Sequence, residues 1–309
     1  MEFIVGYTGF VGSNIVANHQ FDGLYNSKNV TEAYGKNPDL LVYSGVPAEM
    51  FLANQNPEAD KALMDQAIEN IKQINPKKIV LISTIAVYQE PDGVDEDYQI
   101  DESTLTAYGA NRLYLEQWVE KNMSDYHIVR LPGLYGKNLK KNFIYDFIHY
   151  VPPMLNQVKY SELSEKEALI KEHYILQDNG FYKCMLPIDA KAERETLKEA
   201  FRRVGFSALN FTDSRGTFQY YNLKNLWNDI EIAVKNDIKK LNLAVEPVTI
   251  AELYDELTGE TFVNELPKAV PYFNYKTKYA QLWNGENGYI LGKEAVLEDV
   301  KTYIKEQFA

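Results

Sequence analysis

A tyrosine–arginine pair and two hydroxyl side chains are the residues best suited to acid–base chemistry. Ser83 and Thr84 end an apolar run, and Tyr108 precedes Arg112 by four positions. On a helix these two would be neighbours, so a fixed cation would lie beside the phenol and lower its pKa from about 10 toward neutrality. A strand-end hydroxyl would hold a carbonyl or alcohol oxygen beside the phenol. Proton transfer at that oxygen would accompany hydride transfer at its carbon.

The pair alone carries little weight, because the chain has 23 tyrosines and several have a cation four residues on. What distinguishes Tyr108 is a glycine turn near the N-terminus, where the apolar run Phe3–Val5 leads into Gly6, Gly9 and Gly12. A strand, a glycine turn and a helix in this order present backbone N–H groups to a phosphate. The spacing is G-x-x-G-x-x-G, and the alternative is a purely structural turn.

These residues need a scaffold, and the first half of the chain predicts one by alternating strand and helix patterns. The predicted sheet is parallel, with helices on both faces. Strands are expected at 2–5, 23–26, 39–43, 77–83 and 127–131, and helices after Gly12, at 57–74 and at 105–122.

From about residue 138 this rhythm stops. Helical, polar stretches rich in tyrosine are expected through 142–205, and a strand is expected within 216–223. Helices are expected at 224–240, at 249–257 and at the C-terminus. Ligands of open parallel sheets bind beyond the carboxyl ends of the strands. The turn at 6–12 and the segments 26–29, 44–48 and 83–88 are therefore the candidate binding segments.

Composition excludes several classes of function. The 309 residues carry a net charge of −12, which argues against nucleic acid or an anionic membrane as the main partner. Cys184 is the only cysteine, so neither an internal disulfide nor a cysteine metal cluster is expected. The four histidines lack ligand spacing, and no metal site is predicted. No run approaches the roughly 20 apolar residues of a membrane span, and we expect a cytoplasmic protein.

Taken together, these motifs resemble the extended short-chain dehydrogenase/reductases, the NAD-dependent epimerase/dehydratase family. The resemblance rests on the glycine turn, on Ser83-Thr84-x-x-Val87-Tyr88, on Tyr108-Gly109-x-x-Arg112 and on Arg130-Leu131-Pro132-Gly133-Leu134-Tyr135-Gly136, with a weaker echo after residue 217. It implies a Rossmann-type doubly wound sheet, a nicotinamide cofactor, Thr84 as the catalytic hydroxyl and Tyr108 as the acid/base. It also implies a smaller mixed α/β C-terminal region that recognises a sugar, often a nucleotide-sugar, and a homodimer.

The resemblance also divides the chain into a dinucleotide-binding domain, 1–137 with 215–247, and a substrate region, 138–214 with 248–309. Together with Tyr108 and Arg112, the residues expected to bind the cofactor are Gly6, Thr8, Gly9, Phe10, Val11, Gly12, Ser27, Lys28, Ser44, Gly45, Ser83, Pro132, Gly133 and Leu134.

Two positions depart from the family pattern. Arg112 stands where the family has lysine; it keeps the charge but passes on a proton poorly. Three interpretations therefore stay open: an active enzyme, a weakened enzyme, or a cofactor-binding protein without turnover. NAD-preferring members place an acid at the end of the second strand, whereas here Ser27 and Lys28 follow it. They would suit a 2′-phosphate, which favours NADP over NAD, unless Lys28 is simply a solvated loop residue.

Other charged groups have simpler alternatives. A substrate pyrophosphate could be bound by three arginines, Arg202, Arg203 and Arg215, although their spacing follows no known motif. The acidic run 95–102 could hold calcium, but a solvated charge run is the preferred interpretation. Arg130 is expected to be a buried structural charge.

Overall fold

The structure, a computed structural model, describes residues 1–308 and divides the chain into two compact units. The first comprises Met1–Leu139, Thr217–Val248 and Tyr272–Val300; the second comprises Lys140–Gly216, Thr249–Pro271 and the residues from Lys301. The segment 272–300 thus groups with the first unit, not with the substrate region to which the sequence division assigned it. Backbone hydrogen bonds such as the one from Ile290 N–H to the Ala244 carbonyl hold it there. That the units serve cofactor and substrate stays a prediction.

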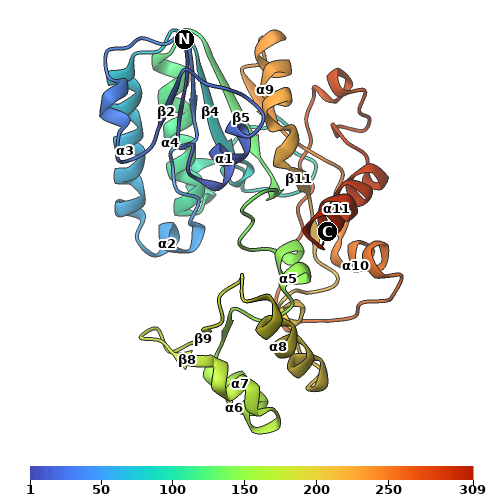
Figure 1. The fold of residues 1–309 in the computed structure, drawn as a ribbon. Helices are drawn as coiled ribbons and strands as arrows, with labels where there is room; N and C mark the ends of the chain where they lie inside the picture. The colour runs from blue at the N-terminus through green and yellow to red at the C-terminus, as the bar shows by residue number, and fades with distance from the viewer. Residues whose placement is uncertain (309) are drawn as a thin grey trace. The chain divides into compact units, whose positions relative to one another are not determined.

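The first unit is built on a parallel six-stranded sheet, as expected (Figure 1). In spatial order its strands are β12 (Lys240–Asn242), β5 (Tyr126–Leu131), β4 (Ile79–Thr84), β3 (Leu40–Tyr43), β1 (Glu2–Val5) and β2 (Gly23–Tyr25). The chain steps from β1 to β2 on one side and then returns to β3 on the other. Residues 26–39, which make this return, form only a single 3-10 turn, η1 (Val30–Ala33). The switch point between β1 and β3 is where such sheets bind ligands.

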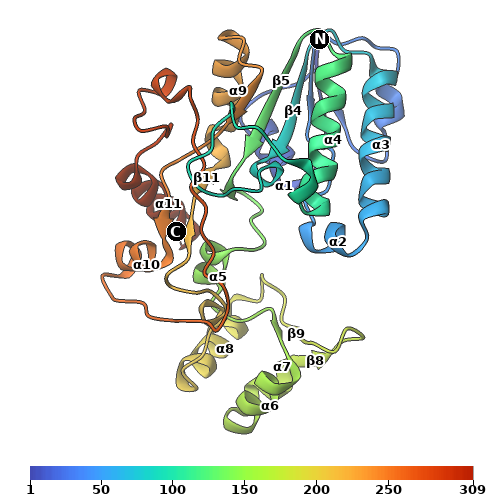
Figure 2. The same ribbon diagram turned by 180° about the vertical axis from the view of Figure 1, so that it is seen from behind.

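Helices cover both faces of this sheet. Figures 1 and 2 show α3 (Pro57–Ile74) and α4 (Ala107–Asn122) on one face, and α1 (Phe10–Val16) and α9 (Leu226–Lys235) on the other. α3 begins where Asn56 accepts a hydrogen bond from Ala59 N–H, with Pro57 in its first turn, and ends at left-handed Asn75. Its predicted apolar stripe is buried against the sheet, which confirms the helix expected at 57–74.

One prediction about the second half was wrong, and one was incomplete. The helix expected at 224–240 ends at Lys235, and Lys240–Asn242 is the sixth strand of the main sheet. Helical stretches do run through 142–205, but the segment also includes an antiparallel sheet of β7 (Met154–Leu155), β9 (Tyr182–Cys184) and β8 (Tyr174–Leu176), which was not predicted. Strands of two or three residues carry too short a period-2 pattern to be recognised in sequence.

The remaining elements are short or peripheral. The second unit also contains α5 (Phe143–His149), α6 (Gln157–Lys166), α7 (Ala168–His173), α8 (Lys191–Arg203), η4 (Ala208–Phe211) and α10 (Ile250–Thr258). The first also contains α2 (Met50–Gln55), η2 (Ile85–Val87), η3 (Glu102–Thr104), β6 (Gly133–Tyr135), β11 (Tyr220–Asn222), η5 (Leu223–Asn225) and η6 (Ala280–Trp283). β10 (Thr217–Phe218) pairs with β13 (Val248–Thr249), and α11 (Lys293–Phe308) ends the chain. Among residues 1–308, no helix is both long and apolar enough to cross a membrane.

Candidate functional site

The glycine turn connects β1 to α1 at the switch point of the sheet. Gly6 has φ of +95°, and a Cβ there would lie 2.4 Å from the Ser44 carbonyl oxygen. A Cβ on Gly12 would lie 2.2 Å from the Gly6 carbonyl oxygen, so α1 packs on the turn only because position 12 has no side chain. Gly9 is the N-cap of α1, and among residues 1–308 no side chain caps the helix. Uncapped N–H groups at the start of a helix are donors of the kind to which anions bind.

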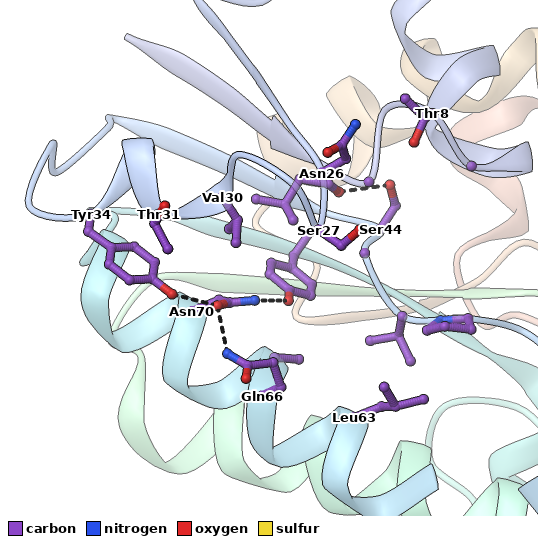
Figure 3. Close-up of a pocket in the computed structure, with 18 residues that line it drawn as sticks. Thr8, Asn26, Ser27, Val30, Thr31, Tyr34, Ser44, Leu63, Gln66 and Asn70 are labelled. Carbon is purple, nitrogen blue, oxygen red and sulfur yellow. Dashed lines mark hydrogen bonds between the residues drawn. The ribbon is translucent and has the colours of Figure 1, made fainter. Parts of the chain in front are cut away.

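A cavity of about 580 Å³ lies beside this turn (Figure 3). Gly6, Thr8 and Gly9 line it from the turn, and Ser27, Ser44 and Gly45 line it from the ends of β2 and β3. These six were predicted cofactor contacts. Lys28 is exposed and is not among the lining residues, so its place beside a 2′-phosphate stays a prediction.

The far wall of the cavity was not anticipated from sequence. It comes from η1 and α3, where Tyr34, Leu63, Gln66 and Asn70 face the cavity (Figure 3). Asn70 Oδ1 accepts hydrogen bonds from Tyr34 Oη at 2.8 Å and Gln66 Nε2 at 3.0 Å. Its Nδ2 donates to Tyr43 Oη at 3.1 Å. The only sequence signal was helical spacing, which places residues 63, 66, 67 and 70 along one side of α3.

A second cavity of about 170 Å³ contains the residues expected to do chemistry. Ser44 and Val46 line both cavities, so the two adjoin at the end of β3. The predicted site residues that line the second one are Val11, Ser44, Ser83, Thr84, Tyr108, Arg112, Pro132 and Leu134. Phe10 and Gly133 line neither cavity.

Tyr108 and Thr84 are brought together by a close helix–turn contact. A Cβ on Gly109 would lie 2.2 Å from the Ala86 carbonyl oxygen, so α4 approaches η2 only because residue 109 is glycine. Thr106 caps α4, and Asn54 Oδ1 accepts a hydrogen bond from Tyr108 N–H at 3.0 Å. Tyr108 thereby lines the second cavity together with Thr84 and Arg112.

The expected electrostatics of the phenol were wrong. The Arg112 guanidinium does lie 4.2 Å from the centre of the Tyr108 ring, as the helical spacing predicted. Burial nevertheless raises the pKa of Tyr108 above its usual value; Arg112 lowers it, but Asp60 raises it further. Desolvation outweighs the cation because Arg112 shares its charge with a buried carboxylate. At neutral pH the phenol is therefore protonated.

Arg112 itself is held by two partners that no local pattern reveals. Its Nη1 donates to Asp60 Oδ2 at 2.7 Å, and its Nη2 donates to the Pro47 carbonyl oxygen at 2.6 Å. Asp60 Oδ2 also accepts from Asn111 Nδ2 at 2.9 Å. Both members of the ion pair are less than a tenth exposed. Arg112 is thus a fixed cation at the edge of the second cavity.

Ser83 belongs to a separate buried network. Its hydroxyl donates to Glu116 at 2.5 Å, and Glu116 forms a buried ion pair with Arg130, 2.6 Å between Nη2 and Oε2. Arg130 also donates to Tyr88 Oη at 2.6 Å. Arg130 is therefore a buried structural charge, as expected. Ser83 also lines the second cavity, but its hydroxyl is bonded to Glu116, whereas Thr84 Oγ1 accepts a hydrogen bond from Ala86 N–H at 3.1 Å.

The remaining charged candidates are paired locally. Arg202 pairs with Glu199, Arg203 with Glu167, and Arg215 with Asp213 and Glu265. In the acidic run, Asp101 caps η3 and Glu96 accepts hydrogen bonds from Asn242 N–H and Thr277 Oγ1, both at 2.7 Å.

Comparison with known proteins extends this description. Residues 4–154, slightly less than half of the chain, match the family model of the RmlD substrate binding domain. No curated protein matches the chain significantly.

Several solved structures have similar folds. A dTDP-4-dehydrorhamnose reductase from Bacillus anthracis in complex with NADP has a TM-score of 0.63 at 14% identity, over 99% of this chain and 97% of that one. A UDP-N-acetylglucosamine 4-epimerase from Methanobrevibacter ruminantium has 0.57 at 14%, over 99% and 98%. A GDP-D-glycero-L-gluco-heptose synthase from Campylobacter jejuni, solved in the presence of NADPH, has 0.59 at 14%, over 99% and 97%. The chain therefore has the Rossmann-type fold of these proteins, and its N-terminal part matches the RmlD substrate binding domain.

Proposed function

We propose that this chain is an NAD(P)-dependent reductase, epimerase or dehydratase of the extended short-chain dehydrogenase/reductase family that acts on a nucleotide-linked sugar. The observation that carries the proposal is the pair of adjoining cavities. One lies beside the uncapped glycine turn, and the other holds Thr84, Tyr108 and Arg112. They share Ser44 and Val46, so one extended ligand can occupy both.

The residues fit a dinucleotide in a definite direction. The turn at Gly6, Gly9 and Gly12 would receive the pyrophosphate, because, among residues 1–308, no side chain caps the start of α1 and these three positions carry no Cβ. The adenosine end would lie in the larger cavity, toward Asn70. The nicotinamide end, whose C4 supplies or accepts the hydride, would lie beside Tyr108. NADP is favoured because Ser27 lines the larger cavity and no acid follows β2.

Tyr108 would act as the acid that delivers a proton to the substrate oxygen. Its raised pKa keeps the phenol protonated at neutral pH, which suits the reduction of a carbonyl. Thr84 would hold the same oxygen. Arg112 would act on the ribose and on the phenol as a charge, without relaying protons. The similar structures named above include proteins of dTDP-, UDP- and GDP-linked sugars, which supports a nucleotide-sugar substrate.

Replacing Tyr108 by Phe tests the chemical step. We expect Tyr108→Phe to lower turnover at least about 100-fold, because a general acid contributes roughly that much, while leaving NADPH affinity within about twofold. The assay follows NADPH oxidation with a panel of dTDP-, UDP- and GDP-linked keto sugars, alongside equilibrium binding of NADPH and NADH. Tyr114→Phe is the matched control, since Tyr114 lies on the same helix and bonds Asp65 at the surface.

Unchanged turnover in Tyr108→Phe would refute the role of Tyr108. Tighter binding of NADH than of NADPH would refute the cofactor preference.

The second candidate is a non-catalytic NAD(P)-binding sensor. It is favoured by one observation: the arginine at the motif position is bonded to Asp60 and Pro47, so it is less available to a ribose than an unpaired lysine. NADPH binding with no turnover of any sugar in the panel, in the wild type and in Arg112→Lys, would favour this candidate.

A further inference from the structure

Three side chains with metal-binding atoms meet at the amino-terminal edge of the main sheet. Asp125 immediately precedes β5, His127 is its second residue, and Asp237 lies in the turn between α9 and β12. One ligand atom from each lies within 4.8 Å of the other two. Thr84 ends the neighbouring parallel strand at the opposite edge, so this cluster is separate from the proposed active site.

The His127 imidazole has an unmet bonding requirement. The side chain is 1% exposed, and its Nδ1 lies 2.7 Å from the Ile238 carbonyl oxygen. A carbonyl only accepts, so Nδ1 carries the hydrogen and Nε2 of the neutral ring presents a lone pair. Among residues 1–308, this buried Nε2 finds no hydrogen-bond partner. It lies 3.7 Å from Asp125 Oδ1, another acceptor. Two acceptors facing each other call for a cation between them.

We propose that Asp125, His127 and Asp237 form a binding site for a divalent transition-metal ion. One imidazole and two carboxylates are a ligand set that Zn²⁺ accepts, at about 2.0–2.2 Å from each atom. A separation of 3.7 Å between Nε2 and Oδ1 leaves room for such an ion between them. The hydrogen bond from Nδ1 to a carbonyl is the arrangement that orients metal-bound histidines.

Two lysines near the cluster compete with the ion but do not satisfy His127. Lys239 Nζ lies 2.5 Å from Asp237 Oδ1 and 3.7 Å from Asp125 Oδ1, and Lys78 Nζ lies 3.3 Å from Asp125 Oδ2. Lys239 is 38% exposed and has a flexible stem, so its ammonium can move into solvent. Surface ion pairs of this kind contribute little free energy. An ion would replace the Lys239 contact and fill the position beside Nε2 as well.

The ion would join the start of β5 to the turn that precedes β12, the edge strand of the sheet. It would therefore stabilise the folded chain without entering the chemical step. A ligand that binds only the folded state stabilises it by RT ln(1 + [L]/Kd), so the melting temperature rises with the logarithm of the ligand concentration above Kd.

The test is calorimetric titration of the full chain with Zn²⁺ after chelator treatment. Asp237→Asn is the principal variant, because Asp237 is 74% exposed and its loss leaves the core intact. We expect one equivalent of Zn²⁺ to bind the wild type and raise its melting temperature, and Asp237→Asn to weaken binding at least about tenfold. Lys239→Met should tighten binding, because the competing ammonium is removed. His127→Gln should abolish it.

His19→Gln is the matched control, since His19 also lies 2.7 Å from a carboxylate, that of Glu2, in a different part of the first unit. It should bind Zn²⁺ as the wild type does. The proposal is overturned by the absence of one-equivalent binding at millimolar Zn²⁺, by unchanged affinity in Asp237→Asn, or by loss of binding in His19→Gln. If His127→Gln fails to fold, Asp237→Asn and Lys239→Met decide the matter.

Discussion

At the scale of single residues, Arg112 shows how one side chain can contact several partners at once. Its two hydrogen bonds and its contact with the Tyr108 ring come from one planar guanidinium. A lysine ammonium has no such fork, so the two side chains are not interchangeable here. Arg112 is fixed in the wall of the second cavity by these contacts. The Asp60 carboxylate that binds it also reduces its electrostatic effect on the pKa of Tyr108.

The Arg112–Asp60 pair yields a stability prediction. We expect Arg112→Lys to keep the pair but lose the bond to Pro47, lowering the free energy of unfolding by about 1–2 kcal/mol. Arg112→Met should cost about 3–5 kcal/mol, because it leaves the Asp60 carboxylate buried without a counter-charge. Adding Asp60→Asn to Arg112→Met should recover much of that loss. Urea denaturation measures all three; equal losses in Arg112→Lys and Arg112→Met would contradict the argument.

The turnover of the same Arg112→Lys variant shows whether the arginine at this motif position weakens an enzyme or is used by it. A large gain in turnover would indicate an enzyme weakened by arginine, and a loss would indicate that arginine is used. This readout is independent of the stability measurement when activity is assayed well below the melting temperature.

At the scale of elements, two close approaches build the site. α1 packs on the turn after β1 through Gly12, and α4 packs on η2 through Gly109. Each helix therefore reaches the carboxyl edge of the sheet at a distance that any side chain would prevent. The short return through η1 leaves α3 to form the far wall of the larger cavity. Gln66 and Asn70 line the cavity because of where α3 packs, and no sequence motif marks them.

We expect alanine at Gly12 to affect mainly the stability of the protein, and alanine at Gly9 to affect mainly its affinity for NADPH. Gly12→Ala should destabilise the protein by about 3 kcal/mol, because its Cβ would lie 2.2 Å from the Gly6 carbonyl oxygen. Gly9→Ala should cost less than about 1 kcal/mol, since its nearest contact would be 3.3 Å, yet should weaken NADPH binding at the point of phosphate approach. Thermal unfolding and NADPH fluorescence titration measure the two effects. Wild-type NADPH affinity in Gly9→Ala would argue against a pyrophosphate at this turn.

At the scale of the whole molecule, the balance of ionised groups links stability to pH. Burial raises the pKa of Asp146, on α5 of the second unit, from 3.8 to about 7. Between these values the folded protein holds a proton that the unfolded chain has released. The free energy of unfolding therefore falls as pH rises from about 4 to about 7, and the loss persists at higher pH.

Asp146→Asn should remove this dependence. We expect it to raise the free energy of unfolding by on the order of 1–3 kcal/mol at pH 8 and to change it little at pH 4, since the carboxyl of the folded protein is then protonated and uncharged, as the amide is. Thermal or urea unfolding across pH 4–8 is the measurement. Asp178→Asn, at an exposed turn, is the control and should leave the profile unchanged. A parallel profile for Asp146→Asn and wild type would show that the carboxyl is solvated.

Assembly also belongs to this scale. The homodimer implied by the family resemblance stays a prediction, as does the division of labour between the two units. Light scattering of the purified chain measures the first, and substrate-bound structures of the chain would address the second.

The sequence by itself determined the parallel α/β scaffold, the glycine turn between β1 and α1 and the adjacency of Tyr108 and Arg112. Each depends on short-range periodicity: apolar runs for strands, glycine positions for the turn, and i, i+4 spacing for the pair. Only the tertiary structure decided the direction in which the pKa of Tyr108 is shifted. It also decided the ion pair of Arg112 with Asp60, 52 residues away in sequence, and the clustering of Asp125, His127 and Asp237. Burial and contacts between distant segments govern these features, and neither leaves a periodic trace in sequence.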